Sequence, residues 1–166
     1  EEGPTFHGRY YSIENFILSP KPVQKPRPPI LVGGGGEKVT LRLVAKYADA
    51  CNFFPKGEEL RKKLDALKEH CKKENRDYSS VLKTKLASVM FGPDREEAMR
   101  KLEKHRPSWL DLERYSSSFL LGSPDDISEQ VEELAEIGID YLIVNFRGKY
   151  DPNSRKIFSR DVMSRF

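Results

Sequence analysis

The chain alternates short apolar runs with stretches in which apolar residues recur every three or four positions. The apolar runs have the length of strands and occupy Ile30–Val32, Ala50–Phe54, Val81–Phe91 and Tyr141–Phe146. Stripes at helical spacing separate them, the clearest at Leu60, Leu64, Leu67 and Cys71. This alternation predicts an α/β fold in which parallel strands are joined by right-handed crossovers. About four strands with flanking helices are half the number that a (β/α)8 barrel needs.

Polar residues at helix starts and a glycine at a helix end support these elements. Asp94, with Glu97 three residues later, has the spacing of a capping box, and Ser123 stands before a proline and two aspartates. Gly138 is placed to end the helix that starts at Ser123. Residues 106–122 carry only scattered apolar anchors, so we expect an irregular or briefly helical insertion there.

The two ends of the chain differ from its centre. Residues 1–28 form an extended lead-in, in which Phe6–Leu18 favours a short β-hairpin and a run of prolines then keeps the chain stiff. Residues 29–148 hold the β/α units, and residues 149–166 form a polar tail with a final helix near Phe158. We expect a single domain over all 166 residues, which is long enough to bury a core.

Charge and composition disfavour several classes of function. Lys and Arg number 29 against 26 Asp and Glu, and the signs are interspersed, so the net charge of +3 indicates solvated helix faces rather than a nucleic-acid patch. No apolar run reaches the roughly 18 residues of a membrane span and no signal peptide is visible, so we expect no membrane partner and a cytoplasmic location. Cys51 and Cys71 fit buried thiols better than a disulfide framework.

A run of four glycines is the strongest candidate for a binding site. Gly33, Gly34, Gly35 and Gly36 follow an apolar strand and precede a helix. Residues without Cβ let backbone N–H groups approach a ligand closely, and a helix N-terminus favours an anion. The pattern therefore predicts a phosphate cradle, and the alternative is a tight strand-to-helix turn without a ligand.

Four further candidates lie at the ends of predicted strands or just after them. Asn52 and Phe53 end the second strand, on the side where the active sites of barrels form, although core packing is the favoured use of Phe53. Lys56 lies in the next loop, where it can meet a phosphate or an anionic substrate or remain an ordinary surface lysine. Arg147, just after the last strand, can hold an anion or remain exposed to solvent.

The sequence assigns no catalytic residue. His7, His70 and His105 do not cluster and have no acids or cysteines at ligand spacing, which argues against a metal site. Neither a Ser-His-Asp arrangement nor a G-x-S-x-G elbow is present, so acyl-transfer chemistry is also disfavoured.

Three segments of the chain carry a resemblance to a known family. They read FHGRYY, PKPVQKPRPPILVGGGGEKVTLRLVAKYADACNFF and GSPDDISEQVEELAEIGIDYLIVNF. Together they resemble the C-terminal half of luciferase-like monooxygenases, and within that family the oxidoreductases that use the deazaflavin coenzyme F420. The resemblance implies a TIM barrel of roughly twice this length, whose first four strands are absent from this sequence. Strands five to eight would be Ile30–Val32, Ala50–Phe54, Lys83–Phe91 and Tyr141–Phe146.

The resemblance also implies a cofactor and a reaction. Hydride would pass between coenzyme F420 and a small organic substrate, with the cofactor's phosphate on the glycine run, chiefly at Gly35 and Gly36. FMN is the alternative cofactor, because the same loop takes its phosphate, and monooxygenation would then become available.

A hypothesis of a different class is a non-catalytic half-barrel. Four parallel strands would leave both edge strands unpaired, at Ile30–Val32 and Tyr141–Phe146, and one inner face apolar and open. Such edges tend to pair with another chain. This hypothesis therefore predicts a homodimer, or pairing with a separately encoded N-terminal half of the barrel.

Overall fold

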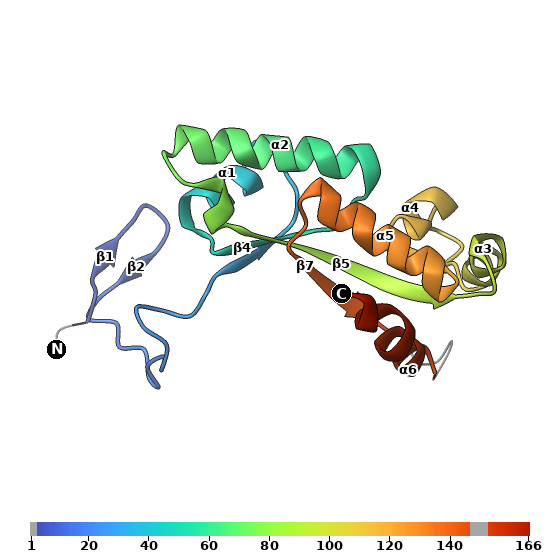
Figure 1. The fold of residues 1–166 in the computed structure, drawn as a ribbon. Helices are drawn as coiled ribbons and strands as arrows, with labels where there is room; N and C mark the ends of the chain where they lie inside the picture. Colours follow the sequence, from blue (N-terminus) through green and yellow to red (C-terminus); the bar gives the residue numbers. More distant parts are fainter. Residues whose placement is uncertain (1–2, 147–152) are drawn as a thin grey trace.

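The structure, a computed structural model, describes residues 3–146 and 153–166 (Figure 1). In this part of the chain the main sheet has five strands, β3 (Leu31–Gly33), β4 (Ala50–Phe53), β5 (Leu82–Phe91), β6 (Phe119–Gly122) and β7 (Tyr141–Asn145). The helices are α1 (Thr40–Tyr47), α2 (Gly57–Lys73), α3 (Arg95–Lys104), α4 (Leu112–Ser116), α5 (Pro124–Ile137) and α6 (Ser154–Ile157). Single turns of 3₁₀ or π helix lie at Tyr78–Ser80, Phe158–Val162 and Met163–Arg165.

The longest strand, β5, lies at the centre of the sheet, and all strand pairs are parallel. Its residues 82–85 pair with β4, and its residues 84–88 pair with β7 on the opposite side. Ser88 pairs with both β7 and β6, so β6 must lie on the β4 side, beyond the end of β4. β3 pairs with β4, so β3, β6 and β7 each pair with a single strand and are the edges of the described sheet.

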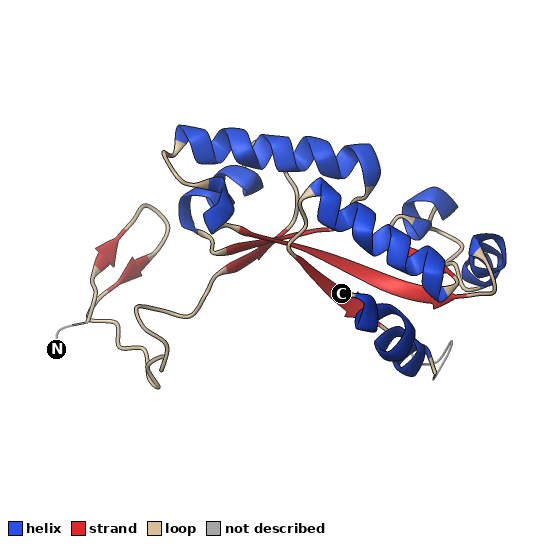
Figure 2. Cartoon of the chain, viewed as in Figure 1, coloured by secondary structure: helices blue, strands red, loops and turns tan. Residues whose placement is uncertain are grey.

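Helices α1, α2 and α5 cover one face of the sheet, which we call the outer face (Figure 2). Apolar side chains that alternate along the strands meet the helix stripes there. The core comprises Leu41, Val44, Leu60, Leu64, Leu67 and Leu134 from the helices and Cys51, Phe53, Ala87 and Val89 from the strands. The strand residues between these point to the other, inner face.

The inner face is only partly covered. At its far end α3 and α4 pack on it, where Ala98 and Leu102 contact a cluster that includes Met90, Phe119 and Leu121. At the amino ends of β3, β5 and β7 the face is open, since Leu31, Leu82 and Tyr141 all expose large apolar side chains, whereas Ala50, Asn52 and Thr84 between them are buried. An open apolar face is unusual for a parallel sheet, which normally buries both of its faces.

Side-chain caps fix where two helices begin. The Asp94 carboxylate accepts a hydrogen bond from the Glu97 amide at 2.8 Å and starts α3. At α5 a full capping box forms, because the Ser123 hydroxyl accepts from the Asp126 amide and the Asp126 carboxylate accepts from the Ser123 amide. Gly138, with φ of 106°, ends α5 in the left-handed conformation that glycine tolerates.

The structure confirms the α/β class, with parallel strands and flanking helices in half of a barrel, and corrects one segment. Residues 106–122 are not only an irregular or helical insertion, because Phe119–Gly122 joins the sheet as β6. The predicted hairpin is present as β1 (Phe6–His7) and β2 (Ser12–Ile13), and it stands apart from the sheet in Figure 1. No helix in the described ranges is long and apolar enough to cross a membrane.

Candidate functional site

The glycine run lies where the sequence predicts it, between the carboxyl end of β3 and the start of α1. Gly34 has φ of 117°, a conformation that residues with a side chain rarely adopt. Its amide donates to the Asn52 carbonyl at 3.2 Å, which extends the pairing of β3 with β4. A Cβ on Gly33 would meet no atom within 4 Å, so the end of this strand faces open space.

The second half of the run is closely packed by neighbouring side chains. A Cβ on Gly35 would lie 2.7 Å from Cδ of Lys63, and one on Gly36 would lie 2.9 Å from Oγ1 of Thr40. The Lys63 ammonium donates to the Gly35 carbonyl at 3.1 Å and is within ion-pair distance of two glutamates. The close approach at Gly35 is therefore made by a lysine of α2, which places a cation beside the loop.

Strand register lines up four residues across the inner face. Gly33 pairs with Asn52, Asn52 with Thr84, and Thr84 with Tyr141. The Thr84 hydroxyl donates to Oδ1 of Asn52 at 2.9 Å, and both side chains are buried. Because buried polar atoms are stable only when they are hydrogen-bonded, this pair is a fixed polar patch beside the glycine run.

A second polar pair lies nearer the carboxyl ends of the strands. Ser88 of β5 is buried and pairs in register with Asn145 of β7, which is exposed at the sheet edge. Asn145 is thus the last residue of β7, at the carboxyl end of the sheet. Arg147, the predicted anion-binding residue next to it, lies outside the described residues.

Phe53 and Lys56 lie on the outer side of the sheet. Phe53 is fully buried among helix residues, so its ring packs in the core and does not face the glycine run. Lys56 is the residue before α2, and it lines a cavity between α2 and α5. Alternation along β4 explains the difference from Asn52, because successive side chains of a strand point to opposite faces.

Sequence reasoning did not single out three residues that the fold brings to this region. Thr84 and Ser88 are polar positions on the inner face of β5, and their alternation with apolar residues was a usable signal. Lys63 had no such signal, because it lies 28 residues from Gly35 in a lysine-rich helix. Contacts of that kind depend on how α2 packs over the loop.

The arrangement suits an anion held mainly by backbone donors. Exposed backbone at Gly33 and the start of α1 provide donors of the kind that bind phosphate. The Lys63 ammonium lies beside them, and Glu37 and Glu59 already offset its charge. Among the described residues, no three His, Cys, Asp or Glu side chains gather closely enough to hold a metal ion.

An α/β half-barrel with a glycine loop at a strand end is the class of protein that the fold and the site define. The chain matches the family described as luciferase-like monooxygenase over residues 1–119, and it belongs to that family.

Relatives in this family use different cofactors. The chain is 25% identical over 176 residues to an FMNH(2)-dependent dimethylsulfone monooxygenase of Pseudomonas fluorescens, covering 86% of this chain and 47% of that protein. It is 24% identical over 189 residues to an F420-dependent glucose-6-phosphate dehydrogenase of Microbacterium testaceum, covering 99% of this chain and 55% of that protein. The chain thus spans about half the length of these relatives.

A solved structure shows the same fold. An F420-dependent secondary alcohol dehydrogenase, in complex with an F420-acetone adduct, superposes with a TM-score of 0.76 at 16% identity. The match covers 99% of this chain and 55% of that one, so the whole described fold corresponds to part of a luciferase-like TIM barrel.

Proposed function

We propose that this chain is the phosphate-binding half of a luciferase-like oxidoreductase that uses coenzyme F420. One observation carries the proposal: the glycine run ends β3 at a point where Gly33 faces open space beside the polar Asn52–Thr84 pair. The F420-dependent relative and the F420-dependent structural neighbour support this cofactor. FMN is the alternative, supported by the FMNH(2)-dependent relative.

The residues present fit the phosphate end of either cofactor. Backbone groups of Gly33–Gly36 and of the start of α1 would hold the phosphate, with the Lys63 ammonium beside the loop. Asn52, beside the run, would orient the part of the cofactor that lies on the inner face. When bound, the deazaflavin supplies hydride transfer to or from a small organic substrate, while the protein binds and orients both molecules.

Titration of the purified chain with F420 and with FMN, followed by fluorescence, tests this proposal. Gly33→Val is the informative variant, because its side chain would enter open space and leave the fold intact while obstructing a ligand on the loop. We expect saturable binding of F420 that weakens at least tenfold in the variant, at an unchanged unfolding midpoint. Binding of neither cofactor, or equal affinity in Gly33→Val, would contradict the proposal.

We further propose that a second chain completes the sheet. Two features support this: the edge strands β3 and β7 each lack a second partner among the described strands, and the inner face exposes Leu31, Leu82 and Tyr141. The second chain would be another copy of this one or a separately encoded N-terminal half. A module of this kind that only self-associates, without catalysis, remains the alternative function.

A cytoplasmic location is part of the same proposal. Cys51 and Cys71 are free and buried thiols, which suits a reducing compartment. Expression with a fluorescent fusion and microscopy would check it, and export of the fusion would contradict it.

A further inference from the structure

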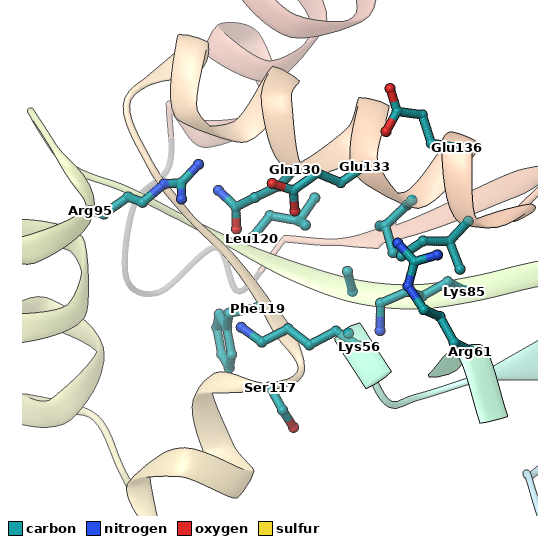
Figure 3. A pocket seen from close by; sticks show the side chains of 14 residues that line it. Lys56, Arg61, Lys85, Arg95, Ser117, Phe119, Leu120, Gln130, Glu133 and Glu136 are labelled. Carbon is teal, nitrogen blue, oxygen red and sulfur yellow. The ribbon is translucent and has the colours of Figure 1, made fainter. Parts of the chain in front are cut away.

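A cavity of about 370 Å³ lies on the outer face of the sheet, between the start of α2 and the length of α5 (Figure 3). Its position separates it from the glycine run. Lys85 and Ala87, which line the cavity, alternate with Thr84 and Ser88 along β5 and therefore point to the opposite face.

Positive side chains from three elements line this cavity. Lys56 and Arg61 come from the start of α2, Lys85 from the middle of β5, and Arg95 from the start of α3 (Figure 3). Two carboxylates, Glu133 and Glu136, line the α5 side. The apolar part of the lining comprises Ala87, Phe119, Leu120, Leu134 and Ile137. The cavity is thus amphipathic, because charged side chains and apolar side chains line it together.

Most of the positive charge has no anionic partner. Arg95 is paired with Asp126 at 3.1 Å and with Glu129 at 3.0 Å. The Lys85 ammonium donates only to the neutral carbonyls of Phe54 and Pro55, at 2.6 and 2.8 Å.

The other two cations, Lys56 and Arg61, are exposed residues of the cavity lining. Within residues 3–146 and 153–166, neither the Lys56 ammonium nor the Arg61 guanidinium has a hydrogen bond or an ion pair. The cavity is therefore lined by three cations that have no anionic partner within ion-pair distance among the described residues: Lys56, Arg61 and Lys85.

Burial, and to a smaller extent neighbouring positive charge, lowers the pKa of both lysines. Burial lowers the pKa of Lys85 to about 8, with a further contribution from the charge of Lys56. The pKa of Lys56 is lowered by burial and by Arg95, while Glu133 opposes the shift. An anion placed between these groups would stabilise their charged forms and reduce the repulsion.

We propose that this cavity binds a small organic oxyanion. Its phosphate or carboxylate group lies between Lys56, Arg61 and Lys85, and its apolar part rests on Ala87 and Leu134. Arg61 offers a planar pair of donors that matches either kind of oxyanion, and the lysines act as point charges. Glu133 and Glu136 limit the size of the charged group, because a second anionic group would lie against them.

Described residues alone build this site, so the isolated chain is the right material for a test. Calorimetry would follow titration with inorganic phosphate and, separately, with acetate, with ionic strength held constant by sodium chloride. We expect saturable binding of at least one probe and a matching rise in the unfolding midpoint. Phosphate binding without acetate binding would assign a phosphate-bearing ligand, and the reverse would assign a carboxylate.

A pair of charge-matched double variants makes the test specific. Lys56→Gln with Arg61→Gln should weaken binding at least tenfold, whereas Lys62→Gln with Lys68→Gln, at exposed positions of the same helix, should leave it unchanged. Absence of saturable binding by both probes, or equal weakening in both double variants, would overturn the proposal. Gly33→Val should leave oxyanion binding in the cavity unchanged. The test of the cavity is therefore independent of the test of the cofactor site.

Discussion

Lys85 is the residue whose environment departs most from that of an ordinary lysine. Its side chain is only 2% exposed, and its nitrogen lies between two backbone carbonyls of the segment after β4. A neutral amine keeps two N–H donors, so both hydrogen bonds survive loss of the proton. Burial and the neighbouring Lys56 therefore lower the pKa to about 8 without breaking the contacts.

This pKa predicts how stability depends on pH. In the unfolded chain Lys85 has a pKa of 10.5, so between about pH 8 and 10.5 the unfolded state binds more protons and the free energy of unfolding rises with pH. We expect an increase of about 1 kcal/mol between pH 7 and 9 from this residue. Burial also raises the pKa of Cys51 to about 11, which opposes the gain above pH 9.

Urea unfolding of the wild type and of Lys85→Met, at pH 7 and at pH 9, measures the effect. Between pH 7 and pH 9, the free energy of unfolding of the wild type should rise by about 1 kcal/mol relative to that of Lys85→Met. Parallel behaviour of the two proteins would show that Lys85 keeps an ordinary pKa in the folded state.

Single residues of the candidate site were predictable only in part. The glycine run could be placed from its sequence, because four residues without Cβ between a strand and a helix leave few alternatives. The face that each strand residue occupies depends on register, which is why Asn52 and Phe53 looked equivalent in sequence but point to opposite faces. Lys63 reaches the loop only through packing between helices.

Among the elements, β6 shows why short buried strands escape prediction. Phe119–Gly122 is buried at all four positions, so it has no alternation of apolar and polar residues. It is also too short to be distinguished from a loop by periodicity. Its pairing with the last residues of β5 supplies the missing information, and that pairing depends on the whole sheet.

The start of α5, by contrast, could be predicted from the sequence, and its cap can be tested by mutation. Ser123→Ala removes the acceptor for the Asp126 amide and half of the capping box. We expect a loss of about 1 kcal/mol in the free energy of unfolding, which is typical for such a cap. Ser108→Ala, at an exposed turn position, is the matched control and should leave stability unchanged. Equal unfolding midpoints in both variants would refute the role of the cap.

On the scale of the whole molecule, the chain is a half-barrel with an exposed inner face. The resemblance of its motifs to the C-terminal half of the family predicted the order of its main strands, which the sheet confirms. What closes the barrel cannot be predicted from this sequence, because neither the strands nor the helices encode the partner of a free edge. The exposed apolar residues on the inner face are the physical reason to expect one.

With the isolated chain alone, the sheet can be completed only by a second copy of the same chain. We therefore expect a dimer in size-exclusion chromatography with light scattering. Leu82 and Leu43 provide a matched pair of variants, since they are 43% and 42% exposed, on the inner face and on α1 respectively. Leu82→Lys places a charge on the face that a partner would cover, so it should shift the dimer toward monomer. Leu43→Lys adds the same charge on the helix layer and should leave the dimer intact. A monodisperse wild-type monomer would contradict self-association, because the open face would then be stable in water without a second copy.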